Sequence, residues 1–422
     1  MKKDDFLDRL GDIDESFIEE ADREEEKEGI NVAQIGVLAA CVLMAFGIIA
    51  FMPKNTTPSE ADGTSVVLEE LPKLTIGEDM SGMGFEGYMA YDISEIISSE
   101  PWNEGMKIKT LPVFDNVLLD DENKFPDPQG NPHVQKLFSD GTLYNDLCKV
   151  IEKLGLTPSD FTFRDNSPTE KQKEEIREKY ASVGEEVPAG FLAPSCLIAE
   201  NADYEIRAEG THEVGIKFKN PVKLPEGLEL GYFTPLESIE KTAEYLKTEY
   251  THIIDMENPV TAIDGGDMDI YKRRHYTVSF YEKGATAEEA ILNSAFKRVY
   301  FTGNEEGDLT FILLDSRDLS SKLGDYPIVS SDEAENLLLE GHFVTSLGGI
   351  MPKEENIASC ELIYKRSTWL ETLMPYYKFL VYVPEMPNLG DVADAKQYAA
   401  FYVPAVRSEY IENYPQWDGS IN

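Results

Sequence analysis

The chain has 422 residues, and its hydrophobic and aromatic fractions of 42% and 10% are typical of a folded protein rather than a disordered one. This length predicts two or three domains. The net charge of −41 at pH 7 repels nucleic acid and anionic lipid headgroups, so binding to DNA, RNA or a lipid surface is disfavoured. Basic protein partners and cationic ligands are compatible with it.

An acidic head occupies residues 1–29, with 13 Asp and Glu against five Lys and Arg. Apolar residues recur in it at spacings of three and four, which predicts an amphipathic helix with one apolar stripe: Phe6, Leu10, Ile13, Phe17 and Ile18. So short a segment cannot build a core of its own. It is therefore either a solvated segment or a helix whose stripe binds a partner protein.

The string LGDIDESFIEEA, Leu10–Ala21, resembles the N-terminal signature of membrane-bound anti-sigma factors of Gram-positive bacteria. The resemblance implies that the head lies in the cytoplasm and binds an extracytoplasmic-function sigma factor. An acidic amphipathic helix suits that role, because its apolar face can fill a groove while its acids face a basic surface.

The stretch Ile30–Met52 carries no charge. At about 1.5 Å per residue, a helix of this length reaches roughly 34 Å, enough to cross a hydrocarbon core of about 30 Å. A cleavable signal peptide would need a basic start and a shorter apolar core. Leu38-Ala39-Ala40-Cys41 matches a lipoprotein cleavage site, but cleavage there would leave an apolar new N-terminus. We therefore predict one permanent transmembrane helix in contact with the lipid bilayer.

The Lys and Arg residues near the two ends of this stretch set its orientation. The 29 residues before it contain five, whereas the 29 residues after it contain only Lys54 and Lys73. We therefore predict a single-pass protein of the cell membrane, with a cytoplasmic N-terminus and an extracytoplasmic C-terminal region.

A linker is predicted at residues 53–82, where the string PKNTTPSEADGT is polar and lacks periodicity. The string GMGFEG, Gly82–Gly87, spells G-x-G-x-x-G. Neither a buried strand before it nor a prompt helix after it is predicted, so we expect a loop and no dinucleotide cofactor.

Beyond the linker we predict an α+β ectodomain in three parts, residues 83–233, 234–325 and 326–422. Helices are predicted at residues 134–154 and after capping boxes that begin at Ser167, Thr234, Thr286 and Ser330. Aromatic and β-branched runs predict strands in antiparallel sheets covered by helices on one face: Lys107–Val113, Glu205–Ala208, Glu213–Phe218, Tyr276–Tyr281, Arg298–Thr302, Leu309–Leu314, Cys360–Tyr364, Tyr376–Val383 and Tyr398–Val403.

The segment Tyr326–Ala334, YPIVSSDEA, followed by Leu337, Leu338 and Gly341, resembles the capped helix of PepSY-like modules. The resemblance implies two such units in tandem over about Thr234–Ile411. Similar patterns occur in membrane-anchored regulators of the YycH/YycI kind, which restrain a sensor kinase from outside the membrane. The function expected from both resemblances is a membrane-bound sensor or anti-sigma factor. The alternative is an envelope accessory or structural protein that acts through its ectodomain on another membrane protein, such as a sensor kinase.

The sequence contains no nucleophile elbow, zinc-protease motif or P-loop, so we predict no catalytic residue, no metal site and no enzyme activity. The acidic run Asp264–Asp269 is expected to be a solvated turn rather than a calcium site, because it lacks the bidentate Glu. The basic run Lys272–His275 is expected to pair with nearby acids or to dock a partner. Cys148, Cys196 and Cys360 have irregular spacings and allow at most one disulfide.

Overall fold

The structure, a computed structural model, describes residues 71–77, 86–117, 142–184, 187, 196–269, 271–367, 370–384 and 394–420. The predicted head, the predicted span Ile30–Met52 and most of the predicted linker lie outside these ranges. Within them, no helix is both long enough and apolar enough to cross a membrane.

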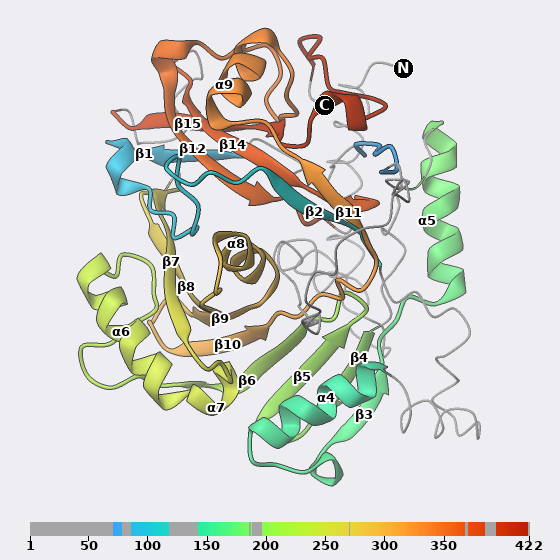
Figure 1. The fold of residues 1–422 in the computed structure, drawn as a ribbon. Coiled ribbons are helices and arrows are strands. Elements are labelled where there is room, and N and C mark those ends of the chain that lie inside the picture. Colours follow the sequence, from blue (N-terminus) through green and yellow to red (C-terminus); the bar gives the residue numbers. More distant parts are fainter. Residues whose placement is uncertain are drawn as a thin grey trace, which may run out of the picture.

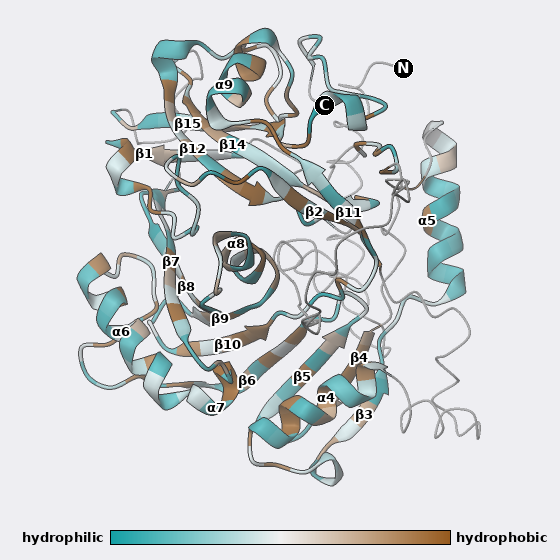
Figure 2. Cartoon of the chain, viewed as in Figure 1, coloured by the Kyte–Doolittle hydropathy of each residue, from teal (hydrophilic) through white to brown (hydrophobic). Residues whose placement is uncertain are grey.

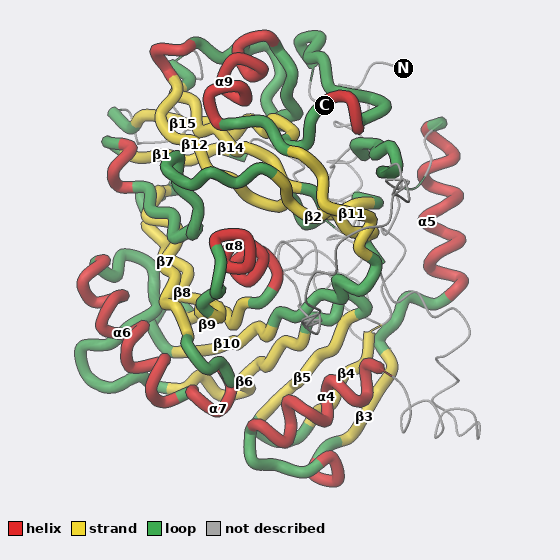
Figure 3. Tube along the Cα trace, viewed as in Figure 1, coloured by secondary structure: helices red, strands yellow, loops and turns green. Residues whose placement is uncertain are grey.

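The described part of the chain has an α+β fold dominated by antiparallel strands, as predicted (Figure 3). A 12-stranded sheet runs through all three predicted parts of the ectodomain. Its strands, in spatial order, are β12 (Ile357–Tyr364), β14 (Pro375–Tyr382), β15 (Lys396–Pro404), β1 (Gly87–Ala90), β7 (Pro259–Met268), β8 (Arg274–Glu282), β9 (Arg298–Gly303), β10 (Leu309–Leu314), β6 (Val214–Val222), β5 (Tyr204–Glu209), β4 (Cys196–Glu200) and β3 (Thr162–Asp165). A three-stranded sheet contains β11 (Lys322–Pro327), β2 (Thr110–Asp115) and β13 (Thr372–Leu373).

The described helices lie on both faces of the large sheet, which differs from the predicted one-face cover. They are α4 (Thr142–Lys153), α5 (Glu170–Val183), α6 (Leu236–Glu249), α7 (Thr251–Ile254), α8 (Ala287–Phe296) and α9 (Ser331–Glu340). The sheet curls around α8, whereas α6 and α7 lie outside the curl (Figure 1). The difference arises because a sheet this long bends back on itself. Its inner face then packs against one helix, α8, and its outer face packs against others, α6 and α7.

Separate hydrophobic cores fill the two sides of the sheet. One core packs α4, α6 and α7 against β4 to β10, with Leu147 and Ile216 fully buried at 0% exposure. A second core packs α8 and α9 against β12, β14 and β15 around Phe401. Strand β15 is buried along almost its whole length, whereas α5 is mostly hydrophilic along its length (Figure 2). The stability of the fold therefore comes from burial on both faces of one sheet.

Two of the four predicted capping boxes sit where the sequence places them. The Ser330 hydroxyl accepts from the Glu333 amide, and α9 then ends at Gly341 in the left-handed conformation. The Thr286 hydroxyl accepts from the Glu289 amide at the start of α8. Both match the local rule that a hydroxyl residue satisfies a free N–H in the first turn.

The other two capping predictions are wrong. Helix α5 is capped by Thr169 rather than Ser167, because Thr169 forms its own box with Gln172 while the Ser167 Oγ accepts from the Cys196 amide at 2.9 Å. Helix α6 has Pro235 at its N-cap and no side-chain cap, and Thr234 is buried instead. At Ser167 a tertiary contact takes the hydroxyl away from the helix end, whereas the Thr234 hydroxyl is buried without a hydrogen-bond partner among the described residues.

The predicted strands are confirmed with small shifts in their bounds, and Leu309–Leu314 is β10. Two of these strands, β5 and β6, pair as an antiparallel hairpin with Ile206 opposite Ile216. The turn predicted at Asp264–Asp269 is wrong, because most of it lies in β7. There Gly265 exchanges backbone hydrogen bonds with Ile97, and a Cβ on Gly266 would stand 2.2 Å from the Glu95 carbonyl oxygen. The glycines let another segment approach the strand closely.

Candidate functional site

A cleft of about 350 Å³ opens beside the end of the β7–β8 hairpin. Its wall consists of carboxylates from β7 and the residues after it, ring side chains, one guanidinium and one hydroxyl: Tyr232, Asp264, Gly265, Asp267, Asp269, Arg273, His275 and Thr277. Asp264 and Thr277 are cross-strand partners, so their side chains share one face of the sheet. The cleft therefore gathers acids in a position set by strand register.

Two large aromatic side chains close to lining residues of the cleft are exposed to solvent. Phe233 is 62% exposed and Tyr271 is 69% exposed, which is unusual for side chains of this size. The Arg273 guanidinium lies between the rings of Tyr232 and Tyr271, 4.5 Å and 5.2 Å from their centroids. Phe233 has a positive φ of 66°, a costly conformation for a bulky residue, and its amide donates to the Arg274 carbonyl. We call Phe233 and Tyr271 the aromatic rim.

The acids of the cleft differ in how far they are neutralised. The Asp269 carboxylate bonds the Arg273 Nε at 2.7 Å, and its hydrogen bonds from Arg273 and Tyr271 outweigh desolvation and lower its pKa. Burial raises the pKa of the Asp267 carboxyl group, and the positive charge of Lys378 lowers that pKa by less. Burial also lowers the pKa of His275, so that ring is uncharged at neutral pH.

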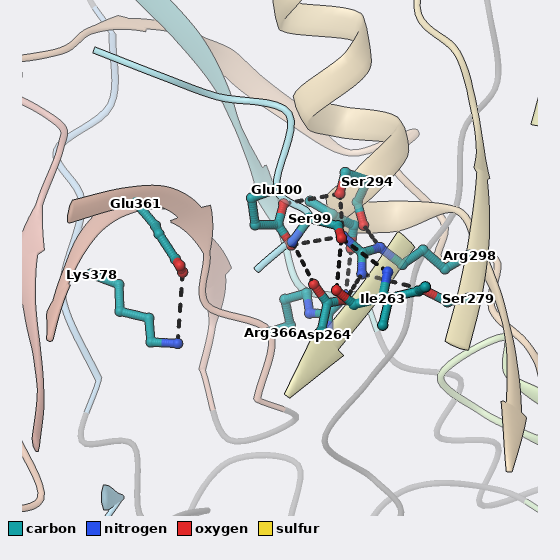
Figure 4. Close-up of polar contacts among 11 residues, drawn as sticks. Ser99, Glu100, Ile263, Asp264, Ser279, Ser294, Arg298, Glu361, Arg366 and Lys378 are labelled. Carbon is teal, nitrogen blue, oxygen red and sulfur yellow. Dashed lines mark hydrogen bonds and ion pairs between the residues drawn. The ribbon is translucent and has the colours of Figure 1, made fainter. Parts of the chain in front are cut away.

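Below the cleft, Asp264 joins a buried network centred on Arg298, the first residue of β9 and only 4% exposed (Figure 4). The Arg298 guanidinium donates to Asp264 Oδ2 at 2.8 Å and to Glu100 Oε1 at 2.7 Å. Its Nε donates to the Ser294 carbonyl at 2.7 Å, which ties β9 to the last turn of α8. The Ser99 amide donates to Asp264 Oδ1 at 2.7 Å. One side chain thus joins β7, α8, β9 and the segment before β2.

Two carboxylates compensate the buried charge of Arg298. Burial works to lower the pKa of Arg298, but the negative charges of Glu100 and Asp264 outweigh it and hold that pKa above its ordinary value. The guanidinium suits this role, because its planar fork can bond two carboxylates at once. The network is therefore a permanent clamp rather than a titrating group.

A second buried pair lies apart from this network in Figure 4. Lys378 of β14 and Glu361 of β12 are 3.7 Å apart, at 16% and 17% side-chain exposure. The Lys378 Nζ donates to the Tyr88 hydroxyl at 3.1 Å. Desolvation works against the charge of Lys378, but Tyr88 and Glu361 outweigh it and raise its pKa. Lys378 thus stays charged and ties β14 to β1.

The side chains of the cleft are suited to binding a positively charged group. Carboxylates with aromatic rings beside them bind ammonium and guanidinium groups through charge and through the ring faces. Asp267 is the acid with the least compensation, so an entering cation would be stabilised most by it. Within the described ranges, no three His, Cys, Asp or Glu side chains are grouped as metal ligands.

The residues singled out in the sequence are placed as follows. The predicted partner-binding residues lie outside the described residues: Phe6, Leu10, Ile13, Phe17 and Ile18. The basic run pairs with nearby acids as expected, since Arg273 bonds Asp269 and Arg274 lies 2.5 Å from Glu95. The three described cysteines form no disulfide with one another: Cys148, Cys196 and Cys360.

The network centre was missed by the sequence reasoning. Arg298 was expected only as the first residue of a strand, and its partners Glu100 and Asp264 are 198 and 34 residues away. The available signal was the basic pair Lys297-Arg298 between two apolar runs, AF and VYF, where a charge that is buried needs a partner.

No family model matches this sequence, and no curated protein matches it. Among solved structures, the chain is similar to an uncharacterized protein from Eubacterium rectale. The sequence identity is 10%, the alignment covers 70% of this chain and 82% of that chain, and the TM-score is 0.29.

Proposed function

We propose that this chain is a single-pass membrane regulator whose ectodomain senses a signal and whose acidic head holds a sigma factor. The uncharged stretch Ile30–Met52 and the Lys and Arg asymmetry support the topology. The apolar stripe of the head supports a protein partner on the cytoplasmic side. The cleft and its aromatic rim are the surface that we assign to recognition outside.

The observation that carries this proposal is the anchoring of Leu71–Gly77, which lies within the predicted linker but is packed against the C-terminal end of the chain, so the linker prediction is wrong for these residues. The Leu74 amide donates to the Tyr410 carbonyl at 2.8 Å, and the Glu412 amide donates to the Leu74 carbonyl at 2.9 Å. Leu74 is 1% exposed, and the Asn413 side chain bonds the backbone of Ile76 in both directions at 2.8 Å. A rearrangement of the ectodomain would therefore move the chain that leads to the membrane, as a signalling protein requires.

We also propose that residues 234–325 and 326–422 are PepSY-like units in tandem. Each part supplies antiparallel strands and one helix with a hydroxyl cap, α8 capped by Thr286 and α9 capped by Ser330. Both helices pack in the core around Phe401. This arrangement supports the resemblance on which the idea rests.

The second candidate is an accessory protein that acts on another membrane protein through its ectodomain. The exposed rim of Phe233 and Tyr271 favours it, because large exposed aromatic side chains concentrate at protein interfaces.

Co-purification of the tagged full-length protein in detergent, from the cells that make it, separates the two candidates. A head variant, Phe6→Ala with Phe17→Ala, is expected to reduce the recovered sigma factor about tenfold or more, because two apolar anchors are lost. A rim variant, Phe233→Ser with Tyr271→Ser, is expected to leave that recovery unchanged.

The matched control for the head variant is Glu19→Gln, which changes a charge on the head and keeps the apolar stripe. Equal sigma-factor recovery from wild type and the head variant, or none from wild type, contradicts the proposed function. Loss of a membrane-protein partner in the rim variant alone would favour the accessory role.

A further inference from the structure

A row of charged side chains crosses the large sheet at one level. The Glu209 amide donates to the Glu213 carbonyl at 3.0 Å, and the Asp315 amide donates to the Arg298 carbonyl at 3.0 Å. Between these pairs, Leu314 of β10 is opposite Val214 of β6. One step further along the same antiparallel register, Asp315 comes opposite Glu213. Residues opposite each other point to the same face, so these two acids are direct neighbours.

Both acids of this pair are buried. Glu213 is 4% exposed and Asp315 is 3% exposed. In the part of the chain that the structure describes, neither carboxylate oxygen of Asp315 has a hydrogen-bond partner, and neither does Glu213 Oε1. Two buried negative charges side by side are strongly unfavourable, because each loses its hydration and repels the other.

The groups that face the pair come from several elements. Glu209 lies beside Glu213 but is itself bonded to Arg207 at 2.7 Å. Arg317, Arg366 and Arg298 act on the pair through their positive charge, and Thr211 lies beside Glu213. Burial is the largest influence on both acids and outweighs these cations, so the pKa of each is raised well above its ordinary value.

The pair sits where the chain passes from the large sheet to the small one. Asp315 directly follows β10, and residues 316–321 lead to β11. Residues 316–321 contact the end of β2: the Arg317 Nη1 donates to Asn116 Oδ1 at 2.8 Å, and the Asp115 amide donates to the Ser321 carbonyl at 2.9 Å. The charge state of the acid pair therefore acts on the contact between the two sheets.

We propose that Glu213 and Asp315 together hold one proton at neutral pH, and that loss of this proton destabilises the junction between the two sheets. The pair would be a pH-sensitive element of the ectodomain. The inference does not depend on the membrane topology or on a sigma-factor partner.

The direction of the pH effect follows from linkage. The folded chain holds the proton more tightly than the unfolded chain, whose carboxyl groups titrate near pH 4. Between that pH and the raised pKa of the folded pair, the unfolded chain has released a proton that the folded chain keeps. Stability contributed by the pair is therefore complete below about pH 4 and is lost as the pH rises toward the folded pKa.

The test is urea unfolding of the full-length protein in detergent between pH 5 and pH 9, with wild type, the single variants Glu213→Gln and Asp315→Asn, and the double variant that carries both. Each substitution replaces one acid with a neutral side chain of nearly equal shape. Relative to the double variant, the folded-to-unfolded ratio of wild type is expected to fall about tenfold per pH unit within the window, the effect of one proton. Each single variant is expected to differ less from wild type, because burial still raises the pKa of the acid that remains. Glu237→Gln, which removes an exposed acid, is the control and is expected to show no such difference.

A second measurement keeps the proposal testable if a variant fails to fold. Infrared spectra of the folded wild type at pH 7 are expected to show the carbonyl band of a protonated carboxylic acid. A wild-type protein without that band, or a stability difference between wild type and variants that does not change with pH, overturns the proposal.

Discussion

Replacing Arg298 by Met is expected to lower the free energy of unfolding by about 3–5 kcal/mol. The substitution removes the guanidinium that compensates Glu100 and Asp264, which lie at 23% and 28% side-chain exposure. The two partly buried carboxylates then lack the main positive charge that compensates them. Urea unfolding of the full-length protein in detergent, followed by circular dichroism, measures the change.

The control for this prediction is Arg164→Met. Arg164 also lies between two carboxylates, Glu200 at 3.8 Å and Glu205 at 3.6 Å, but its side chain is 41% exposed. Exposed pairs contribute about 1 kcal/mol or less, so a small loss is expected. Adding Glu100→Gln and Asp264→Asn to Arg298→Met should recover part of the loss. Equal losses from the two Arg variants would show that the Arg298 network is not a structural clamp.

The substitution Phe401→Ala is expected to cost about 3–5 kcal/mol of unfolding free energy, because it opens a cavity in a closely packed core. Phe401 of β15 is 0% exposed, and its ring meets Phe343 edge-on with centroids 5.0 Å apart. Strand β15 also links β14 to β1, so this core holds the first and last described strands together. The same urea experiment measures the loss.

Tyr91→Ala is the matched control, since Tyr91 is an aromatic residue at 47% exposure. Its replacement is expected to change stability by less than about 0.5 kcal/mol. The graded variant Phe401→Leu should lose less than Phe401→Ala, because a smaller cavity remains. A loss from Phe401→Ala as small as that from Tyr91→Ala would contradict the position of Phe401 at the centre of this core.

Elements with a strong local signal could be predicted from the sequence. Leu309–Leu314 is a short apolar run between polar turns, and its pattern alone predicts β10. Ser330 and Gly341 carry the rules for a helix start and a helix end, and α9 lies between them. The α+β class follows from counting such elements along the chain.

Elements defined by distant pairing could not be predicted in this way. The pairing register of β7 shifts after Gly265, and Gly265 and Gly266 both have positive φ; in the sequence they are typical of a turn, until Ile97 is seen to pair with Gly265. Strand β13 has only two residues, Thr372 and Leu373, and exists because they pair with β2. The single curled sheet likewise depends on β1 lying between β15 and β7, a contact that no local pattern shows.

The candidate site depends on distant contacts in the same way. The cleft combines residues before α6 with residues of β7 and β8, and Phe233 reads as an ordinary apolar residue in the sequence. The pair of Glu213 and Asp315 appears only once β6 and β10 are placed in register. A sequence shows which side chains are charged, but it does not show which distant residue pairs with each charge or whether the charge is buried.

The proposed topology places the folded region and the acidic head on opposite sides of a membrane. Protease added to intact cells without their wall, with the protein tagged at its N-terminus, tests this topology directly. The proposal predicts that the folded ectodomain is digested while a tagged fragment containing residues 1–29 survives until detergent is added. Digestion of the head with an intact ectodomain, or recovery of the whole chain in the soluble fraction, would contradict it.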